Sequence, residues 1–298
     1  MLKTRIYTGQ VLVLGLVQFI ESIAFSIPSS YYPNYVIGLG ATVASIGVFS
    51  SSFMTAEAIL SPKMGELSDT YGRKRIIRII NGVESETTTS VVKVTMSSSF
   101  KVLLVYSFVN GIGAGFIMPI MVLFYNDKFG LEPIEIGLIM SISGFVGLFT
   151  SYVAGLISDR AGRKPLIGVG SFLSRLCGII LPLIGDVTQA AIVLSVRSLG
   201  FNINGPALRA LRADITPVEA RGRYFGLFRT AMTAGDVVGP IISTYIYDLY
   251  RFQKFEVAGL VFPGYAIPFF VNSALGIAAT TILLVLVEEP KHSNAQPE

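Results

Sequence analysis

The chain has 298 residues, of which 52% are hydrophobic and 14% are charged, and its mean hydropathy is +0.64. This composition excludes a soluble domain and predicts a membrane protein. The net charge of +4 does not indicate nucleic-acid binding, because the basic residues lie in short segments between apolar runs. The single cysteine, Cys177, excludes an internal disulfide, and without a cysteine–histidine cluster we expect no metal site and no cofactor.

Two apolar runs near the N-terminus predict the first two membrane helices. Residues 8–30 follow Lys3 and Arg5 and are long enough to cross a bilayer. A cleaved signal peptide is the alternative, but the run is long for one and has no small-x-small cleavage site. The second run covers residues 39–62, and the strongly basic stretch 63–78 follows it. We therefore expect this stretch to lie in the cytoplasm.

A ten-residue pattern begins at the end of the second span and recurs later in the chain. The first copy is Gly65-Glu-Leu-Ser-Asp-Thr-Tyr-Gly-Arg-Lys74, and the second is Gly155-Leu-Ile-Ser-Asp-Arg-Ala-Gly-Arg-Lys164. The register also holds upstream, where Ile46, Gly47 and Ser51 match Ile136, Gly137 and Ser141. The match extends from a helix into the segment after it, so the two copies mark an internal repeat.

The residue types of this pattern suit a tight cytoplasmic loop between two membrane helices. The first glycine lets another backbone approach, the aspartate can accept hydrogen bonds at a neighbouring helix N-terminus, and the second glycine permits a positive φ. The basic pair marks the cytoplasmic face. The alternative to these specific roles is a simple turn whose charges only set the orientation of the helices. These roles fall on Gly65, Asp69, Gly72, Arg73 and Lys74, and on Gly155, Asp159, Gly162, Arg163 and Lys164.

Both copies resemble the G-x-x-x-D-x-x-G-R-K signature of the major facilitator superfamily, which joins the second and third helices of each six-helix repeat. This resemblance implies an all-α polytopic membrane fold and secondary transport by alternating access. In the family, the signature aspartate docks on the cytoplasmic start of a helix from the opposite repeat. The resemblance therefore implies that Asp69 lies near residues 224–226.

The next segment departs from the family pattern. Residues 79–99 are rich in Ser and Thr and contain no apolar run of 18 residues, so they predict a cytoplasmic linker. A full family member would have four more helices here, roughly 100 residues at about 20 per span plus loops. The partner helix of Asp159 would be among them, so only local partners such as Arg163 are expected for it.

The rest of the chain predicts a complete second repeat of six helices. Its spans are 102–125, 134–157, 166–184, 188–208, 223–248 and 259–287, which makes eight helices, two plus six. The predicted division is a partial first repeat (1–78), a linker (79–99), the second repeat (100–290) and a cytoplasmic tail (291–298). Of the Lys and Arg residues, 17 lie in segments predicted inside and three outside, which puts both termini in the cytoplasm of a cell-membrane protein.

Further motifs in the second repeat are similar to those of the family. Arg197-x-x-Gly200, Pro206 and the stretches 213–217 and 221–226 resemble the fourth-helix signature and the loop that follows it. Gly235-Asp-Val-Val-Gly-Pro240 resembles the fifth-helix signature of antiporters. In this chain it falls in the second repeat, whereas the antiporter diagnosis rests on the first repeat.

Ionisable residues inside spans are costly and usually face a cavity or a partner. Glu21 can serve as a proton or cation site or pair with a donor on another helix, and Arg197 matches a family residue tied to substrate or proton coupling. Glu57 and Arg229 lie near the inner interface, where they can reach water. The candidate substrate and proton residues are Glu21, Asn110, Arg175, Arg197, Asn202, Asn204 and Asp236, although the amides can also simply join helices.

The absence of a phosphate-binding P-loop and of hydrolase motifs argues against an ATP-driven pump or an enzyme. The leading hypothesis is secondary active transport of a small organic molecule across the lipid bilayer, with proton-coupled efflux as its specific form. The alternatives are a non-transporting remnant created by internal deletion of four helices, and a homodimer whose two chains complete one cavity.

Overall fold

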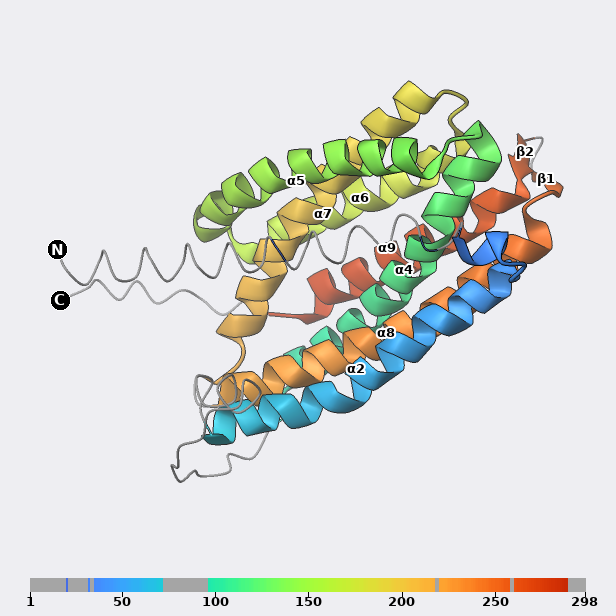
Figure 1. Cartoon of the computed structure of the whole chain (residues 1–298). Helices are drawn as coiled ribbons and strands as arrows, with labels where there is room; N and C mark the ends of the chain where they lie inside the picture. Colours follow the sequence, from blue (N-terminus) through green and yellow to red (C-terminus); the bar gives the residue numbers. More distant parts are fainter. Residues whose placement is uncertain are drawn as a thin grey trace.

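The computed structural model describes residues 20, 32, 35–71, 96–217, 220–257 and 260–288. The described residues form seven long α-helices and one short β-hairpin (Figure 1). The helices are α2 (Val43–Tyr71), α4 (Ser98–Phe129), α5 (Pro133–Ala161), α6 (Arg163–Ile180), α7 (Val187–Asp214), α8 (Arg221–Tyr250) and α9 (Ile267–Leu286). The hairpin strands are β1 (Lys254–Val257) and β2 (Leu260–Pro263), and short 3-10 turns cover Leu181–Leu183 and Gly264–Ala266. The all-α prediction is confirmed, with the hairpin as its one exception in the described part.

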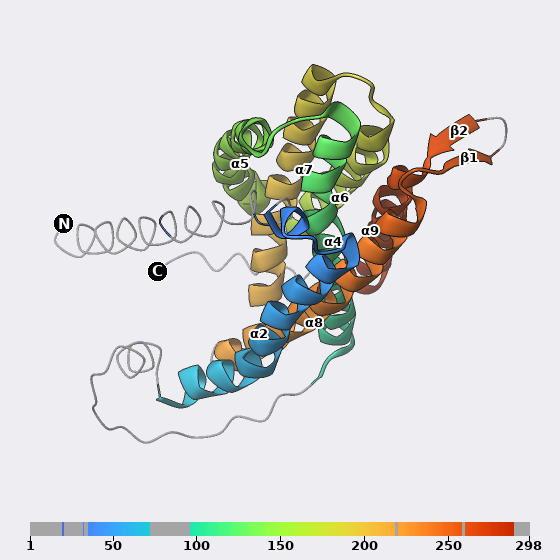
Figure 2. The same cartoon turned by 45° about the vertical axis from the view of Figure 1, so that its right-hand side comes forward.

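The helices form two groups that α9 joins. Helix α8 packs along α2 on one side and α4 on the other, and α7 packs against both α5 and α6. Helix α9 contacts α4 and α6, and therefore links the two groups. Figures 1 and 2 both show α2 and α8 side by side over most of their length. Helix α2 is thus attached to the other described helices chiefly through α8.

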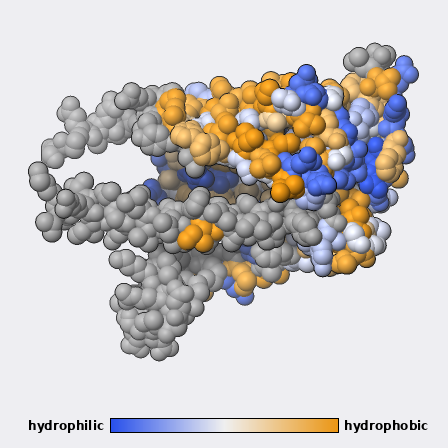
Figure 3. Space-filling view, turned by 45° about the horizontal axis from the view of Figure 1, so that its top comes forward, coloured by the Kyte–Doolittle hydropathy of each residue, from blue (hydrophilic) through white to orange (hydrophobic). Residues whose placement is uncertain are grey.

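The surface of the described helices is suited to lipid. The candidate spans, long and apolar enough to cross a membrane, are Val43–Leu60, Ser98–Phe129, Pro133–Ser151, Arg163–Leu183 and Gly264–Leu286. Helices α7 and α8 are long enough as well, but they are less apolar on average than the other described helices. One face of α5 exposes Ile134, Leu138, Phe145 and Phe149, and apolar residues predominate in the upper part of the coloured surface in Figure 3. Such an extensive apolar surface is that of a polytopic membrane protein.

Two parts of the chain differ from the sequence prediction in kind. Helices α2 and α5 extend into the repeated pattern as far as Tyr71 and Ala161, so residues 65–71 and 155–161 are helical rather than part of a loop. In the second copy, only Gly162 lies between α5 and α6. Gly162 has a φ of 88°, the left-handed conformation that a glycine permits. The last helix begins at Ile267 rather than 259, because residues 254–257 and 260–263 pair as antiparallel strands in which Phe255 lies opposite Phe262.

Glycines set the close approach of α4 and α8. A Cβ atom at Gly111 would meet the backbone carbonyl of Met232, and one at Gly235 would meet the backbone of Phe108 and Ile112. One turn further along, Gly115 and Gly239 face the same crossing. Small residues at four-residue spacing on both helices let the two backbones touch, which is how helices associate in lipid without a hydrophobic driving force.

Candidate functional site

Arg175 connects three helices inside the second repeat. Its guanidinium, which comes from α6, donates hydrogen bonds to Asn272 Oδ1 on α9 at 2.9 Å and to Asn110 Oδ1 on α4 at 3.1 Å. The side chain fits because two glycines leave room for it: a Cβ atom at Gly276 would meet Nε, and one at Gly113 would lie 3.3 Å from Nη1. Both acceptors are neutral, so this cluster satisfies the donors of Arg175 without cancelling its charge.

Arg197 lies one helix away and lines a cavity. The cavity has a volume of about 340 Å³ and is bordered by α4, α5 and α7, with Ser174 contributed by α6. Its polar lining consists of Arg197, Ser143, Ser174 and Ser198. The remaining wall is apolar and includes Met118, Met121, Met140, Leu194 and Phe201. A volume of this size, with one charged side chain in a largely apolar lining, is within the range of small-molecule pockets.

The charge of Arg197 has no partner in the described ranges. No carboxylate there forms an ion pair with it, and the neighbouring charge of Arg175 acts on it unfavourably. The hydroxyl of Tyr125 on α4 is also within electrostatic range of Arg197, is fully buried and has no hydrogen-bond partner among the described residues. A charge at the centre of a bilayer costs roughly 3 kcal/mol on insertion scales, so an Arg without a countercharge among the described residues is a functional signal.

The predicted asparagines have different surroundings. Ser151 on α5 donates a hydrogen bond to Asn202 Oδ1 at 2.8 Å, and the Asn202 amide donates to the Ser198 carbonyl. Asn204 donates to the Tyr106 hydroxyl at 3.4 Å, which joins α7 to α4. These two amides connect helices, whereas Asn110 belongs to the Arg175 cluster.

Asp236 lies apart from the two arginines. It is buried on α8 at the glycine crossing with α4, and the nearest charges acting on it are those of Arg229 and Glu57. Arg229 Nε donates to Glu57 Oε1 at 2.6 Å, so these two residues join α8 to α2. The structure thus places Asp236 on α8 at the crossing with α4, away from Arg175 and Arg197, and the nearby pair of Arg229 and Glu57 joins α8 to α2.

The repeated pattern is described only in part. Gly65 and Asp69 belong to α2, and Gly155 and Asp159 belong to α5, but their surroundings lie outside the description, as do Gly72, Arg73, Lys74 and all of Glu21. Arg163 is buried at the start of α6, and its Nε lies 2.9 Å from Asp214 Oδ2 at the end of α7. This pair joins the second copy to the fourth-helix signature, and Lys164 follows it in the first turn of α6.

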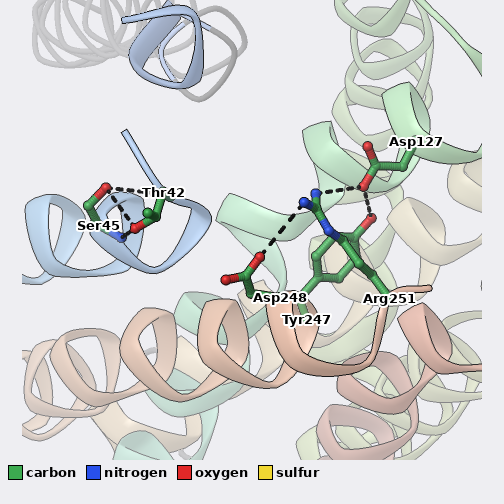
Figure 4. Close-up of polar contacts among 6 residues, drawn as sticks. All are labelled: Thr42, Ser45, Asp127, Tyr247, Asp248 and Arg251. Atoms are coloured by element: carbon green, nitrogen blue, oxygen red, sulfur yellow. Dashed lines mark hydrogen bonds and ion pairs between the residues drawn. The ribbon is translucent and has the colours of Figure 1, made fainter. Parts of the chain in front are cut away.

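The structure also brings together residues that were not predicted. Asn272 is a lone amide in a strongly apolar run, which is the signal that could have singled it out. At the end of the bundle near the hairpin, Tyr247 donates to Asp127 Oδ2 at 3.0 Å and Arg251 lies 3.3 Å from the same oxygen (Figure 4). Arg251 also lies 3.8 Å from Asp248, one turn back on α8. This network ties α8 to α4.

Comparison with known proteins agrees with this architecture. The profile of the Major Facilitator Superfamily matches residues 14–124 and 115–298. An uncharacterized MFS-type transporter of Methanocaldococcus jannaschii is 28% identical over 188 residues, which are 63% of this chain and 45% of that protein. The quinolone resistance protein NorA of Staphylococcus aureus is 22% identical over 198 residues, 66% of this chain and 47% of NorA.

The fold is also found among solved structures. The human organic anion transporter MFSD10 (TETRAN) superposes with a TM-score of 0.53 at 15% identity, over 66% of this chain and 43% of that one. This likeness concerns the fold alone. The chain spans about half the length of the curated relatives it matches. Because the family profile covers nearly all of its residues, the chain belongs to the major facilitator superfamily, a family of membrane transporters and not of enzymes.

Proposed function

We propose that the chain carries out secondary active transport of a small organic molecule, in the form of proton-coupled efflux. The observation that carries this proposal is the open cavity at Arg197, which combines one charged side chain with apolar walls between membrane-crossing helices. The name of one relative, a quinolone resistance protein, supports export of an organic compound. Membership of a transporter family supports the same reading.

The proposed orientation places the protein in the cell membrane with both termini in the cytoplasm. It is supported by the excess of Lys and Arg in the segments predicted inside. The division into a partial first repeat (1–78), a linker (79–99), a six-helix second repeat (100–290) and a tail (291–298) belongs to this proposal. Together these regions make eight spans.

Alternating access needs two bodies that move against each other. We assign α2 to one and the second repeat to the other, and their contact runs along α8. Ser51 donates to the Val237 carbonyl at 2.5 Å, and Glu57 pairs with Arg229 further along. The contact between α2 and α8 therefore includes individual polar interactions that can break and re-form. This supports a movement of α2 relative to α8 during transport.

The test is a proton-flux assay with the purified chain in liposomes and a panel of amphipathic compounds. We expect compound-dependent proton movement that Glu21→Gln reduces with little effect on folding, because proton coupling requires a carboxyl group that can titrate. Glu66→Gln, a change in an exposed carboxylate at the end of α2, is the matched control. Unchanged flux in Glu21→Gln would remove Glu21 from the site.

A non-transporting remnant is the second candidate. The observation in its favour is the share of the relatives that the chain covers, about half. Liposomes that move no compound above the level of protein-free vesicles would favour it.

A homodimer that completes one cavity from two chains is a further form of the transport proposal, and a detergent-corrected mass of two chains in active preparations would support it.

A further inference from the structure

The cavity at Arg197 carries a net positive potential from the described residues that surround it. Arg197 and Arg175 both act there, and no described Asp or Glu forms an ion pair with either. The carboxylates of Glu57 and Asp127 are engaged elsewhere, with Arg229 and Arg251. An organic cation would therefore meet repulsion in this cavity, whereas an anion would be attracted.

The two arginines have different roles in this potential. The guanidinium of Arg175 donates hydrogen bonds to two asparagine side chains, and glycines on α4 and α9 leave the space that it occupies. Arg197 lines the cavity and makes no hydrogen bond with another described residue. The N–H groups of its guanidinium can therefore donate hydrogen bonds to a ligand. The guanidinium is planar and can bind both oxygens of a carboxylate at once.

The remainder of the lining sets the shape of the ligand. Ser143, Ser174 and Ser198 supply hydroxyl groups in the same cavity as Arg197, and the buried Tyr125 hydroxyl nearby has no partner in the described part of the chain. Met118, Met121, Met140 and Phe201 supply polarisable and aromatic wall. Methionine side chains adapt to irregular apolar shapes, so this part of the cavity can accept aromatic or branched apolar groups of different shapes.

We propose that the substrate of this cavity is an amphipathic organic anion, with its carboxylate on Arg197 and its apolar body against the methionines and Phe201. This inference rests on the proposed transport function and narrows its substrate class. Arg175 contributes potential and position but does not contact the ligand. No covalent step is involved.

The experiment compares three probes of nearly equal size on the purified full-length chain in uncharged detergent. They are naphthalene-1-acetate, its neutral amide, and 1-naphthalene-ethylammonium, with binding measured by calorimetry. We expect the carboxylate to bind about tenfold or more tightly than the amide, because a hydrogen bond between two charged groups is stronger than one to a neutral amide by about this factor. We expect the cation to bind weakest. Equal binding of carboxylate and amide would overturn the inference.

Variants assign the effect to Arg197. Arg197→Gln should abolish the preference for the carboxylate and leave amide binding unchanged, and Arg251→Gln, at the far network of Figure 4, should leave both unchanged. Ser143→Asp places a carboxylate in the same cavity and should lower the preference for the carboxylate probe over the amide, because it cancels part of the positive charge of the two arginines. This second variant keeps the test decisive if Arg197→Gln fails to fold, because an undiminished carboxylate preference in Ser143→Asp would contradict the inference.

Glu21, which lies outside the described residues, is the rival source of the countercharge. If its carboxylate already neutralises Arg197, Glu21→Gln will raise the affinity for naphthalene-1-acetate, and that result would overturn the inference. Unchanged affinity supports it. Flux of the same three probes into liposomes separates the two proposals: binding without any flux rejects transport alone, whereas flux without carboxylate preference rejects only the substrate class.

Discussion

Arg175 and Arg197 show how two similar residues in neighbouring helices acquire different roles. Arg175 is surrounded by acceptors on α4 and α9, and its guanidinium joins these helices to α6. Arg197 faces serines and methionines across a cavity, with no acceptor of its own in the described ranges. The difference is set by what the adjacent helices present, and it separates an arginine that stabilises the bundle from one that can bind a ligand.

The first prediction concerns the amide that holds Arg175. Asn272→Ala removes the 2.9 Å bond to a buried charged donor, so we expect a loss of about 1–2 kcal/mol of unfolding free energy. Thermal unfolding of the purified protein measures this. Asn126→Ala loses only an exposed bond to the Leu131 carbonyl and serves as the control. Equal losses in the two variants would show that the Arg175 cluster does not support the bundle.

At the scale of elements, the repeated register has two different environments. Gly47 on α2 faces α8, where a Cβ atom would meet Thr244 Oγ1 and lie 2.7 Å from the Pro240 carbonyl oxygen. Its counterpart on α5 is Gly137, and a Cβ atom there would have no described atom within 4 Å. Ser51 bonds to the Val237 carbonyl on α8, whereas Ser141 bonds only to its own helix. One copy of the pattern is therefore packed against a helix, and the other is open in the described part of the chain.

This asymmetry gives a matched pair of variants. Gly47→Ala should force α2 away from α8 and cost about 1–3 kcal/mol, because the clash is partly with backbone. Gly137→Ala should be neutral or stabilise the helix by up to about 1 kcal/mol, since alanine favours helix over glycine. Thermal unfolding in detergent compares the two. A cost at Gly137 as large as that at Gly47 would mean that the face of α5 is covered in the folded protein.

At the scale of the whole molecule, polar groups lie at both ends of the described helices and in the region between these ends. The pair of Arg163 and Asp214 lies where α6 begins and α7 ends, and the network of Asp127, Tyr247 and Arg251 lies at the opposite end of α8 and α4. The Arg175 cluster and the cavity lie between these ends. This order, with polar groups at both ends and a polar cavity between them, is expected of a transporter spanning a bilayer.

The orientation prediction is tested by cysteine labelling in intact cells. Cys177 is buried and is the only native cysteine, so Cys177→Ser provides a background for introduced residues. A cysteine at Asp248, at the outer end of α8, should react with a membrane-impermeant maleimide, and a cysteine at Thr87 should react only after the cells are opened. Labelling of the Thr87 position from outside would reverse the proposed topology.

Several features of this protein follow from the sequence alone. Membrane class, the approximate limits of α4 to α8, the internal repeat and the family all depend on local properties, namely the length of apolar runs, the placement of Lys and Arg, and a pattern whose spacing is visible in one chain. Gly162 is an example, because a sharp interruption between two helices calls for a residue that tolerates positive φ.

Other features were decided only by tertiary structure. The sequence names Arg175 and Arg197 as costly residues, but only the neighbouring helices determine that Asn272 binds one and that a cavity opens beside the other. Residues 254–257 and 260–263 pair as antiparallel strands, and a hydropathy pattern cannot distinguish such short segments from the start of a helix. Likewise, Gly47 and Gly137 are equivalent in the repeat, and they differ because α8 packs on α2, a long-range contact that no local pattern encodes.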